Sequence, residues 1–430
     1  MANVYWVGGT GTWDTTATAN WSASTGGAAG AAAPTSSDTA IFDAASGGGV
    51  VTLGEAVAVS ALTMTGFAGE LAAAGFAISL AGASGTLYTG DTTYTTSGTP
   101  LLRMTAAGSS ARTITCGAAT EANAVSLSIE AGSGAVTQTG SVMHLTTTSG
   151  FGGSLASQSR TIYGDLTIAA GTTVTVGTAY TVFASTSGTP RTITMNGVAF
   201  GQRMGFNGAG GHWKFADTFV QTGGEMYLAN GTLDGNGQNV TVGGQFYLAA
   251  GTKTLTLGSG TWTAAGAGAN AWNLNTNSAG LTVTASTGTI SMTSASAKTF
   301  AGGGKTWPTL NQGGAGALTI TGSNTFADIT ATSLPSTISF TDGTTQTVVD
   351  WNARGIAGSL LTLGPTGAGT WSIGKAGGGP VNLDYLSVSK SIALYRDWFA
   401  GRNSTDGGGN TGWRFTPYSS LIPLILPRRR

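Results

Sequence analysis

The chain has 430 residues, of which 71 are glycine and 8% are charged, and its 18 basic and 18 acidic side chains leave a formal net charge of zero. About a quarter of the residues of an average globular protein are charged, so hydroxyl and amide groups must cover much of this surface. A chain without a basic excess lacks the main attraction for nucleic acid, and no segment reaches the ~20 apolar residues that cross a bilayer. We therefore expect neither nucleic acid nor a membrane as a partner.

The first 45 residues are rich in aromatic side chains. Trp6, Trp13 and Trp21 precede a stretch rich in glycine and alanine. The first coil of a stacked fold needs a lid over its apolar interior, and each tryptophan covers a large area. We predict that residues 1–45 form an N-terminal aromatic cap; the alternative is a platform in which Trp6 and Trp13 contact a glycan. The initial residues lack the basic region and apolar run of a signal peptide, so we expect no export by that route.

Residues 46–345 alternate β-branched and small side chains, with glycine every few positions, which is typical of short strands and turns. Residues 223–232 (GGEMYLANGT) recur 20 positions later as 243–252 (GGQFYLAAGT), and 164–172 (GDLTIAAGT) matches the second copy at four such periods. A repeat of this length in strand-forming sequence indicates a solenoid, whose coils bury their apolar faces only by stacking. We predict an all-β, elongated parallel β-solenoid with about fourteen or fifteen coils in this shaft.

Cysteine and histidine offer little chemistry in this sequence. The single cysteine, Cys116, excludes an intrachain disulfide, and its strand-like surroundings favour a small buried hydrophobe over a nucleophile. His144 and His212 have no acidic or cysteine neighbours at the spacing of metal ligands, so we interpret both as packing or surface residues. We predict no metal site and no cofactor.

Acidic residues are equally sparse. Asp217, Glu225 and Asp234 form the one cluster worth considering, but their spacing does not place two carboxylates on one face of neighbouring coils, as glycoside hydrolysis requires. A lyase would need a base beside acids that bind metal, and the nearest lysines lack acidic neighbours in the sequence: Lys253, Lys298 and Lys305. We therefore predict no catalytic residue and no enzymatic activity.

The last 85 residues differ in composition from the shaft. Residues 346–420 contain further strand patterns and an aromatic, glycine-rich segment with Trp398 and Trp413, which predicts a C-terminal β cap and offers two more candidate glycan contacts. Residues 421–430 (LIPLILPRRR) hold two prolines and fit neither a helix nor a central strand. We predict an extended tail that docks onto a partner, through Leu421, Ile422, Leu424, Ile425, Leu426, Arg428, Arg429 and Arg430.

Two motifs resemble those of known families. The N-terminal motif consists of Trp6, Gly8, Gly9, Gly11, Trp13, Asn20, Trp21, Pro34, 38–42 (DTAIF) and 51–53 (VTL). It resembles the start of autotransporter-associated β-strand repeat proteins, which implies a right-handed β-helix. Residues 383–391 (LDYLSVSKS) and 398–413 (WFAGRNSTDGGGNTGW) are similar to a closing motif of tail-fibre-like and other virion proteins of tailed bacteriophages. Together the two motifs cover about a quarter of the chain.

The second resemblance, with the expected lack of an export signal, favours a phage protein over a secreted adhesin. We expect a non-enzymatic structural protein of a tailed phage particle, assembled in the host cytoplasm, that forms a fibre, spike or surface decoration. Its partners would be its own copies in a homotrimer, other virion proteins and a host surface glycan. The alternatives are a host-glycan-binding adhesin module and a polysaccharide depolymerase.

Overall fold

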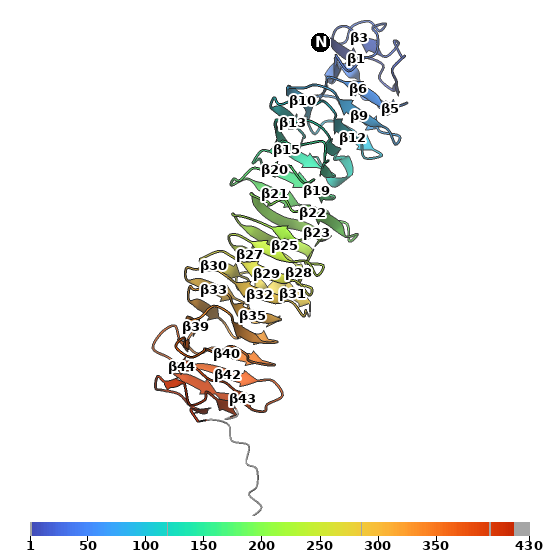
Figure 1. Ribbon diagram of the computed structural model, residues 1–430. Coiled ribbons are helices and arrows are strands. Elements are labelled where there is room, and N and C mark those ends of the chain that lie inside the picture. Colours follow the sequence, from blue (N-terminus) through green and yellow to red (C-terminus); the bar gives the residue numbers. More distant parts are fainter. Residues whose placement is uncertain (1, 118, 285, 395–396, 417–430) are drawn as a thin grey trace, which may run out of the picture. The chain divides into compact units, whose positions relative to one another are not determined.

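A computed structural model describes residues 2–117, 119–284, 286–394 and 397–416 (Figure 1). Nearly all of its regular structure is strand, and the strands stack as a parallel β-solenoid of about 17 turns. Three short 3-10 turns lie wholly within the described residues, η1 (Ala44–Ser46), η2 (Glu121–Asn123) and η3 (Ser278–Gly280). The prediction of an all-β parallel solenoid is confirmed. The number of turns is larger than expected because coils also form outside residues 46–345.

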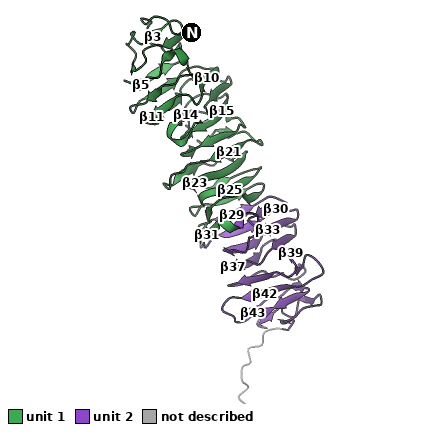
Figure 2. Ribbon diagram, turned by 180° about the vertical axis from the view of Figure 1, so that it is seen from behind, with its two compact units in different colours: residues 1–260, 279–284 green, residues 261–278, 285–430 purple. Residues whose placement is uncertain are grey.

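The chain folds into two compact units, residues 1–260 with 279–284 and residues 261–278 with 285–430, coloured green and purple in Figure 2. In each unit, strands from successive coils pair in parallel to form ladders. One ladder of unit 1 contains β1 (Asn3–Trp6), β4 (Thr39–Phe42), β7 (Ala61–Met64), β10 (Gly85–Gly90), β13 (Arg112–Thr115), β15 (Ala135–Val142), β17 (Ser154–Leu155) and β20 (Thr173–Val174).

Other ladders of unit 1 complete its coils. The second contains β6 (Val57–Val59), β9 (Ala77–Leu80), β12 (Leu101–Met104), β14 (Ser126–Ile129), β16 (Leu145–Thr147), β19 (Leu166–Thr167), β22 (Arg191–Thr194), β23 (Arg203–Phe215), β25 (Met226–Asp234), β28 (Lys253–Thr256) and β31 (Leu281–Thr284). A third joins β15, β18 (Arg160–Ile162), β21 (Tyr180–Phe183), β23, β25 and β27 (Phe246–Leu248). The shorter ones join β2 (Gly11–Trp13), β5 (Val50–Leu53), β8 (Glu70–Ala72) and β11 (Thr95–Ser97), and β24 (Phe219–Val220) and β26 (Val240–Val242).

Unit 2 has the same construction. Its longest ladder contains β30 (Gly268–Asn273), β33 (Lys298–Ala301), β36 (Leu318–Thr321), β39 (Ser336–Phe340), β41 (Leu361–Pro365), β44 (Leu386–Val388) and β47 (Thr405–Asp406). Two more contain β29 (Thr261–Ala264), β32 (Thr289–Met292), β35 (Thr309–Gln312) and β38 (Ile329–Ala331), and β34 (Thr306–Trp307), β37 (Thr325–Phe326), β40 (Thr345–Val348), β42 (Trp371–Lys375) and β45 (Ser391–Ala393). The last joins β43 (Val381–Asn382), β46 (Trp398–Phe399) and β48 (Trp413–Arg414).

Side chains along each strand alternate between the interior and the surface, as the period of a strand requires. In unit 1 one interior column takes a single side chain from each of five successive coils, and all five are at most 2% exposed: Ile162, Phe183, Phe206, Leu228 and Leu248. Burying each such side chain contributes about 1.5–3 kcal/mol. A coil without neighbours would leave these side chains in water, so the stack is the unit of stability.

The structure confirms one repeat of the sequence and corrects the other. Met226, Tyr227 and Leu228 pair in register with residues 246–248, 20 positions on, as predicted. The segment 164–172 is not a further copy of the same position, because Leu166 pairs with Ile193 in the ladder that leads to β28 rather than to β27. Coils differ in length, and the step from Leu166 to Ile193 is longer than 20 residues. A distance of 80 residues therefore does not correspond to four coils.

Residues 1–45 contribute a cluster of buried aromatic rings to the first coil. β1 pairs in parallel with β4 and antiparallel with β3 (Trp21–Ser22), which folds residues 1–45 onto the start of the stack. Trp6, Trp13, Trp21 and Phe42 are all 0% exposed. The ring centroids of Trp6 and Trp21 lie 5.2 Å apart and those of Trp13 and Trp21 lie 5.4 Å apart, both edge to face. The rings fill the interior of the first coil.

Residues 346–416 continue the stack of unit 2. Thr345 of β40 pairs with Ser372 of β42, and Ser336 of β39 pairs with Leu361 of β41. No break in these ladders separates the segment from the coils before it within the described residues. The segment closes with aromatic contacts, in which the rings of Trp351 and Trp398 lie 5.9 Å apart and those of Trp398 and Trp413 lie 5.4 Å apart.

Candidate functional site

The tryptophans that the sequence suggested as glycan contacts serve mainly as core. Trp6 and Trp13 are 0% exposed and Trp398 is 1% exposed, so their rings are not accessible to a ligand. Trp413 is half-buried, and its indole N–H donates to the hydroxyl of Ser391 at 2.9 Å. The expectation of exposed rings at the caps is wrong for the first three, because the end coils have apolar interiors that these rings fill. The predicted docking residues of the tail, 421–430, lie outside the described residues.

Several carboxylates accept backbone hydrogen bonds from a neighbouring coil, and we call these carboxylates clamps. Asp217 accepts the backbone N–H of Met195 at 2.9 Å, one coil earlier in the chain. Asp342 accepts the N–H groups of Gly367 and Gly369 at 2.9 and 2.7 Å. Because a carboxylate that accepts main-chain hydrogen bonds is held in place and satisfies donors that a turn leaves free, these acids stabilise the turns of the solenoid.

The three acids considered from the sequence each bond to a different partner. Besides Asp217, Asp234 accepts the N–H of Asn236 in its own turn at 2.7 Å. Glu225 accepts the hydroxyl hydrogen bond of Tyr180. The three acids therefore have separate partners, and the hydrogen bonds on each have a structural explanation.

The fold brings an acid to each histidine, although neither histidine has one at the short sequence spacing of metal ligands. Nδ1 of His144 lies 3.2 Å from a carboxylate oxygen of Asp165, and Nε2 of His212 lies 3.8 Å from one of Asp234. The hydrogen bonds of His144 and Thr192 lower the pKa of Asp165 to about 2. In each pair the histidine and the acid are about one coil apart in the sequence. A comparison limited to short sequence spacings does not find such a pair. In the described part of the chain, no three His, Cys, Asp or Glu residues gather as metal ligands.

Cys116 is buried and unbonded to another cysteine, as expected for a packing residue. Burial raises the pKa of its thiol to about 12, so the reactive thiolate is scarce at neutral pH.

Some cations lie inside the coils. Lys298 is 1% exposed, and its amine donates to the carbonyls of Ser294, Gly314 and Gly316 at 3.0, 3.3 and 2.5 Å. Burial lowers the pKa of Lys298 to about 8. Arg112, 0% exposed, donates to the carbonyls of Ala106 and Ala131 in the same way. These cations satisfy main-chain acceptors at the corners of the coils.

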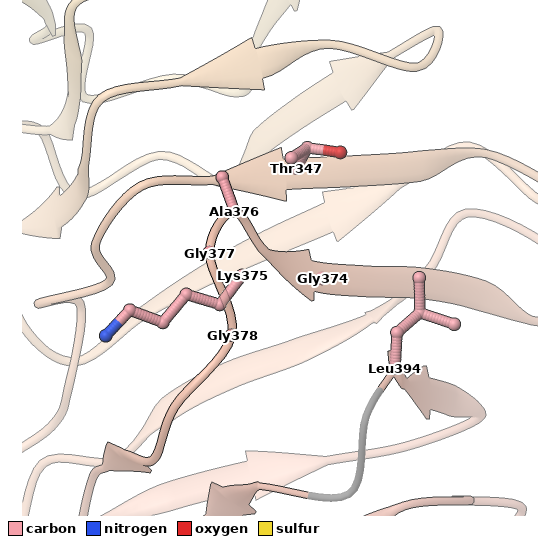
Figure 3. A pocket seen from close by; sticks show the side chains of 7 residues that line it. All are labelled: Thr347, Gly374, Lys375, Ala376, Gly377, Gly378 and Leu394. Atoms are coloured by element: carbon pink, nitrogen blue, oxygen red, sulfur yellow. The ribbon is translucent and has the colours of Figure 1, made fainter.

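A hollow of about 360 Å³ in unit 2 is lined by Thr347, Gly374, Lys375, Ala376, Gly377, Gly378 and Leu394 (Figure 3). Lys375 is its one charged lining residue, and its amine extends away from Leu394 (Figure 3). A single lysine beside an aliphatic side chain and glycines provides no defined set of binding groups, so this hollow is a poor candidate site.

The best candidate site is a row of outward-facing tyrosines in unit 1, Tyr180, Tyr227 and Tyr247, which we call the tyrosine ladder. They lie on β21, β25 and β27, all labelled in Figure 1. Tyr227 and Tyr247 pair in register between buried neighbours, so both rings face outward. Their centroids lie 5.7 Å apart, and those of Tyr180 and Tyr227 lie 5.6 Å apart. Sequence analysis found Tyr227 and Tyr247 only as a repeat and did not identify them as a site.

A charged pair accompanies the ladder. The hydroxyl of Tyr180 donates to Glu225, and Nη1 of Arg203 lies 3.9 Å from the same carboxylate. The Arg203 guanidinium lies 5.4 Å from the centroid of the Tyr180 ring, within the range of a cation–π contact. Partial burial raises the pKa of Tyr180 and Tyr227, so both hydroxyls remain protonated at neutral pH.

A shallow hollow adjoins the ladder on the side of the earlier coils. It has a volume of about 320 Å³, and its lining includes Ser141, Ser159, Thr161 and the ring of Tyr180. Aromatic rings, hydroxyl groups and an arginine–carboxylate pair therefore share one outward face.

No helix in the described residues is long and apolar enough to span a bilayer. No family model, curated protein or solved structure matches the chain.

Proposed function

We propose that this protein is a non-enzymatic structural protein of a tailed bacteriophage particle, in which the stacked coils form a fibre, spike or surface decoration. The observation that carries the structural role is the use of carboxylates as clamps between coils. The phage setting is supported by the resemblance of residues 383–391 and 398–413 to virion proteins.

The clamps favour a structural role over catalysis for a chemical reason. A general acid or base must reach the proton that it transfers and needs a pKa near the working pH. Asp384 accepts the N–H of Asn403 at 3.0 Å and its side-chain amide as well, and these bonds lower its pKa. Asp91 accepts the amides of Gly66 and Thr93, and its pKa is lowered too. At neutral pH these carboxyl groups are therefore ionised, and their oxygens are already engaged in hydrogen bonds.

We propose that the protein assembles as a homotrimer. Its few charged side chains give little repulsion between shafts packed side by side. Light scattering of the purified protein should give a particle mass three times that of the chain; a monomer mass contradicts the trimer without affecting the structural role.

The phage role is tested on particles. An antibody against the chain should label purified phage particles produced by a host that encodes it, and mass spectrometry should find the chain in the same particles. Purified protein incubated with host surface polysaccharide should release no new reducing ends or unsaturated sugars. Absence from the particles contradicts the phage role, and release of sugar ends contradicts the non-enzymatic role.

The same particles test the predicted docking tail. Deleting residues 421–430 should prevent incorporation while the purified variant keeps its strand signal in circular dichroism. Particles that retain the shortened protein contradict the docking role of the tail.

A further inference from the structure

We infer that the outward face of β21, β23, β25 and β27 is a glycan-binding surface, which takes a linear oligosaccharide along the tyrosine ladder and the Arg203–Glu225 pair. The inference depends on this face alone and stands whether or not the protein belongs to a phage particle. It also moves glycan contact from the caps to the side of unit 1.

The position of the rings depends on a glycine. Phe206, Leu228 and Leu248 form an interior column, and the neighbouring outward column contains Gly205, Tyr227 and Tyr247. Tyr180 and Tyr227 are two coils apart, so their backbones are separated by about 10 Å at ~4.8 Å per strand, yet their ring centroids lie 5.6 Å apart.

The Tyr227 ring closes this gap by leaning over Gly205. A Cβ atom at Gly205 would lie 2.2 Å from Cε1 and Cζ of Tyr227, which no real side chain tolerates. The ring therefore occupies space that only glycine leaves free. Three aromatic rings consequently form a continuous surface across four coils, which suits the C–H faces of successive sugar rings.

The surrounding polar groups complement sugar hydroxyls. The side chains of Arg203 and Glu225 are 33% and 32% exposed, so each reaches solvent while remaining anchored to its neighbour. The guanidinium donates hydrogen bonds and the carboxylate accepts them, and a sugar hydroxyl does both. Ser141, Ser159 and Thr161 extend this set into the adjoining hollow of about 320 Å³, a volume at the lower end of the roughly 300–1,000 Å³ of small-molecule sites.

Other macromolecules fit this face less well. Nucleic acid needs an excess of positive charge, whereas Arg203 is paired with Glu225. A peptide that adds a strand needs a free sheet edge, whereas β23 and β25 are each hydrogen-bonded to strands on both sides. Arg160 also lines the hollow, but it is buried and donates to the carbonyl of Ala156. Aromatic faces beside hydroxyl groups and a balanced ion pair are what a glycan requires.

The test uses the full chain on an array of linear bacterial, plant and animal oligosaccharides, followed by calorimetric titration with the best-bound oligosaccharide. Tyr227→Ala and Tyr247→Ala should each weaken binding about tenfold or more, a loss of about 1.4 kcal/mol. Tyr227→Phe should bind within about threefold of the wild type, since the ring remains. Tyr5→Ala, which removes an outward tyrosine of β1, is the matched control and should bind like the wild type.

Gly205→Ala sharpens the test because it leaves all three tyrosines in the chain and displaces only the Tyr227 ring. It should reduce affinity as much as Tyr227→Ala. Thermal unfolding of every variant distinguishes lost binding from lost folding; if Gly205→Ala unfolds, the two tyrosine variants decide the question. The inference is overturned if the wild type binds no oligosaccharide on the array, or if binding survives unchanged in both Tyr227→Ala and Tyr247→Ala.

Discussion

The N-terminal aromatic cluster and the tyrosine ladder both consist of neighbouring rings, but the rings of the cluster point into the core and those of the ladder point outward. Trp6, Trp13 and Trp21 point into the first coil and are fully buried. Tyr227 and Tyr247 alternate with buried residues and point away from the core. In a solenoid, the place of a residue in the inward–outward alternation decides its role more than its chemical type.

The choice of residue type agrees with this difference. Tryptophan supplies the largest apolar area to the interior of the first coil. Tyrosine carries a hydroxyl that remains hydrated or bonds to a neighbour, as Tyr180 does to Glu225. We therefore expect substitutions in the first cluster to affect folding and substitutions in the second to affect binding.

The largest effect should come from the cap. Trp13→Ala removes a 0% exposed ring that packs against Trp21 and Phe42 at 5.4 Å, and should lower the free energy of unfolding by about 3–5 kcal/mol. Urea unfolding followed by circular dichroism measures the loss. Tyr5→Ala, on the preceding strand β1, is the control, and a loss as large for Tyr5→Ala would contradict the assignment of inward and outward rings.

The interior cations should come next. Lys298→Met removes one donor from each of three carbonyls, although the carbonyl of Gly316 keeps the side-chain amide of Gln312 at 2.7 Å. The expected cost is about 1–3 kcal/mol. Lys305→Met, at a half-buried position of the same unit, should cost much less in the same urea titration. Equal effects of the two substitutions would mean that the carbonyl contacts of Lys298 contribute nothing.

Removal of a carboxylate clamp should lower the free energy of unfolding by a smaller amount, and this amount should depend on pH. The pKa of Asp165 is lowered from 3.8 to about 2 by His144 and Thr192. The ionised form is therefore favoured in the folded state, so its stabilisation is complete above about pH 4 and is lost as the pH falls through about 2. The stability difference between the wild type and Asp165→Asn should shrink over that window in urea titrations. A constant difference from pH 5 to pH 2 would exclude a stabilising role for the ionised carboxyl.

The smallest effect on stability should come from the tyrosine ladder. Tyr247→Ala removes an outward ring whose neighbours in the strand supply the core contacts, so the free energy of unfolding should change by less than about 1 kcal/mol. Together with a tenfold loss of glycan affinity, that result would separate binding from folding. A loss of several kcal/mol would place Tyr247 in the core instead.

The sequence by itself determined the architecture. Alternation of apolar and polar residues with frequent glycine specifies short strands, and the recurrence of residues 226–228 at 246–248 specifies stacked coils. These features depend on local or nearly periodic sequence patterns, so they can be recognised from the sequence alone.

Only the tertiary structure decided which coils and side chains meet. Coil length varies with the turns, so sequence spacing does not reveal that Leu166 faces Ile193, that Asp165 reaches His144, or that Tyr227 leans over Gly205 toward Tyr180. Register is set by the fit of interior side chains across neighbouring coils, which is a property of the packed stack. The direction of each aromatic ring follows from that register, which is why the tryptophans became core and the tyrosines became the candidate site.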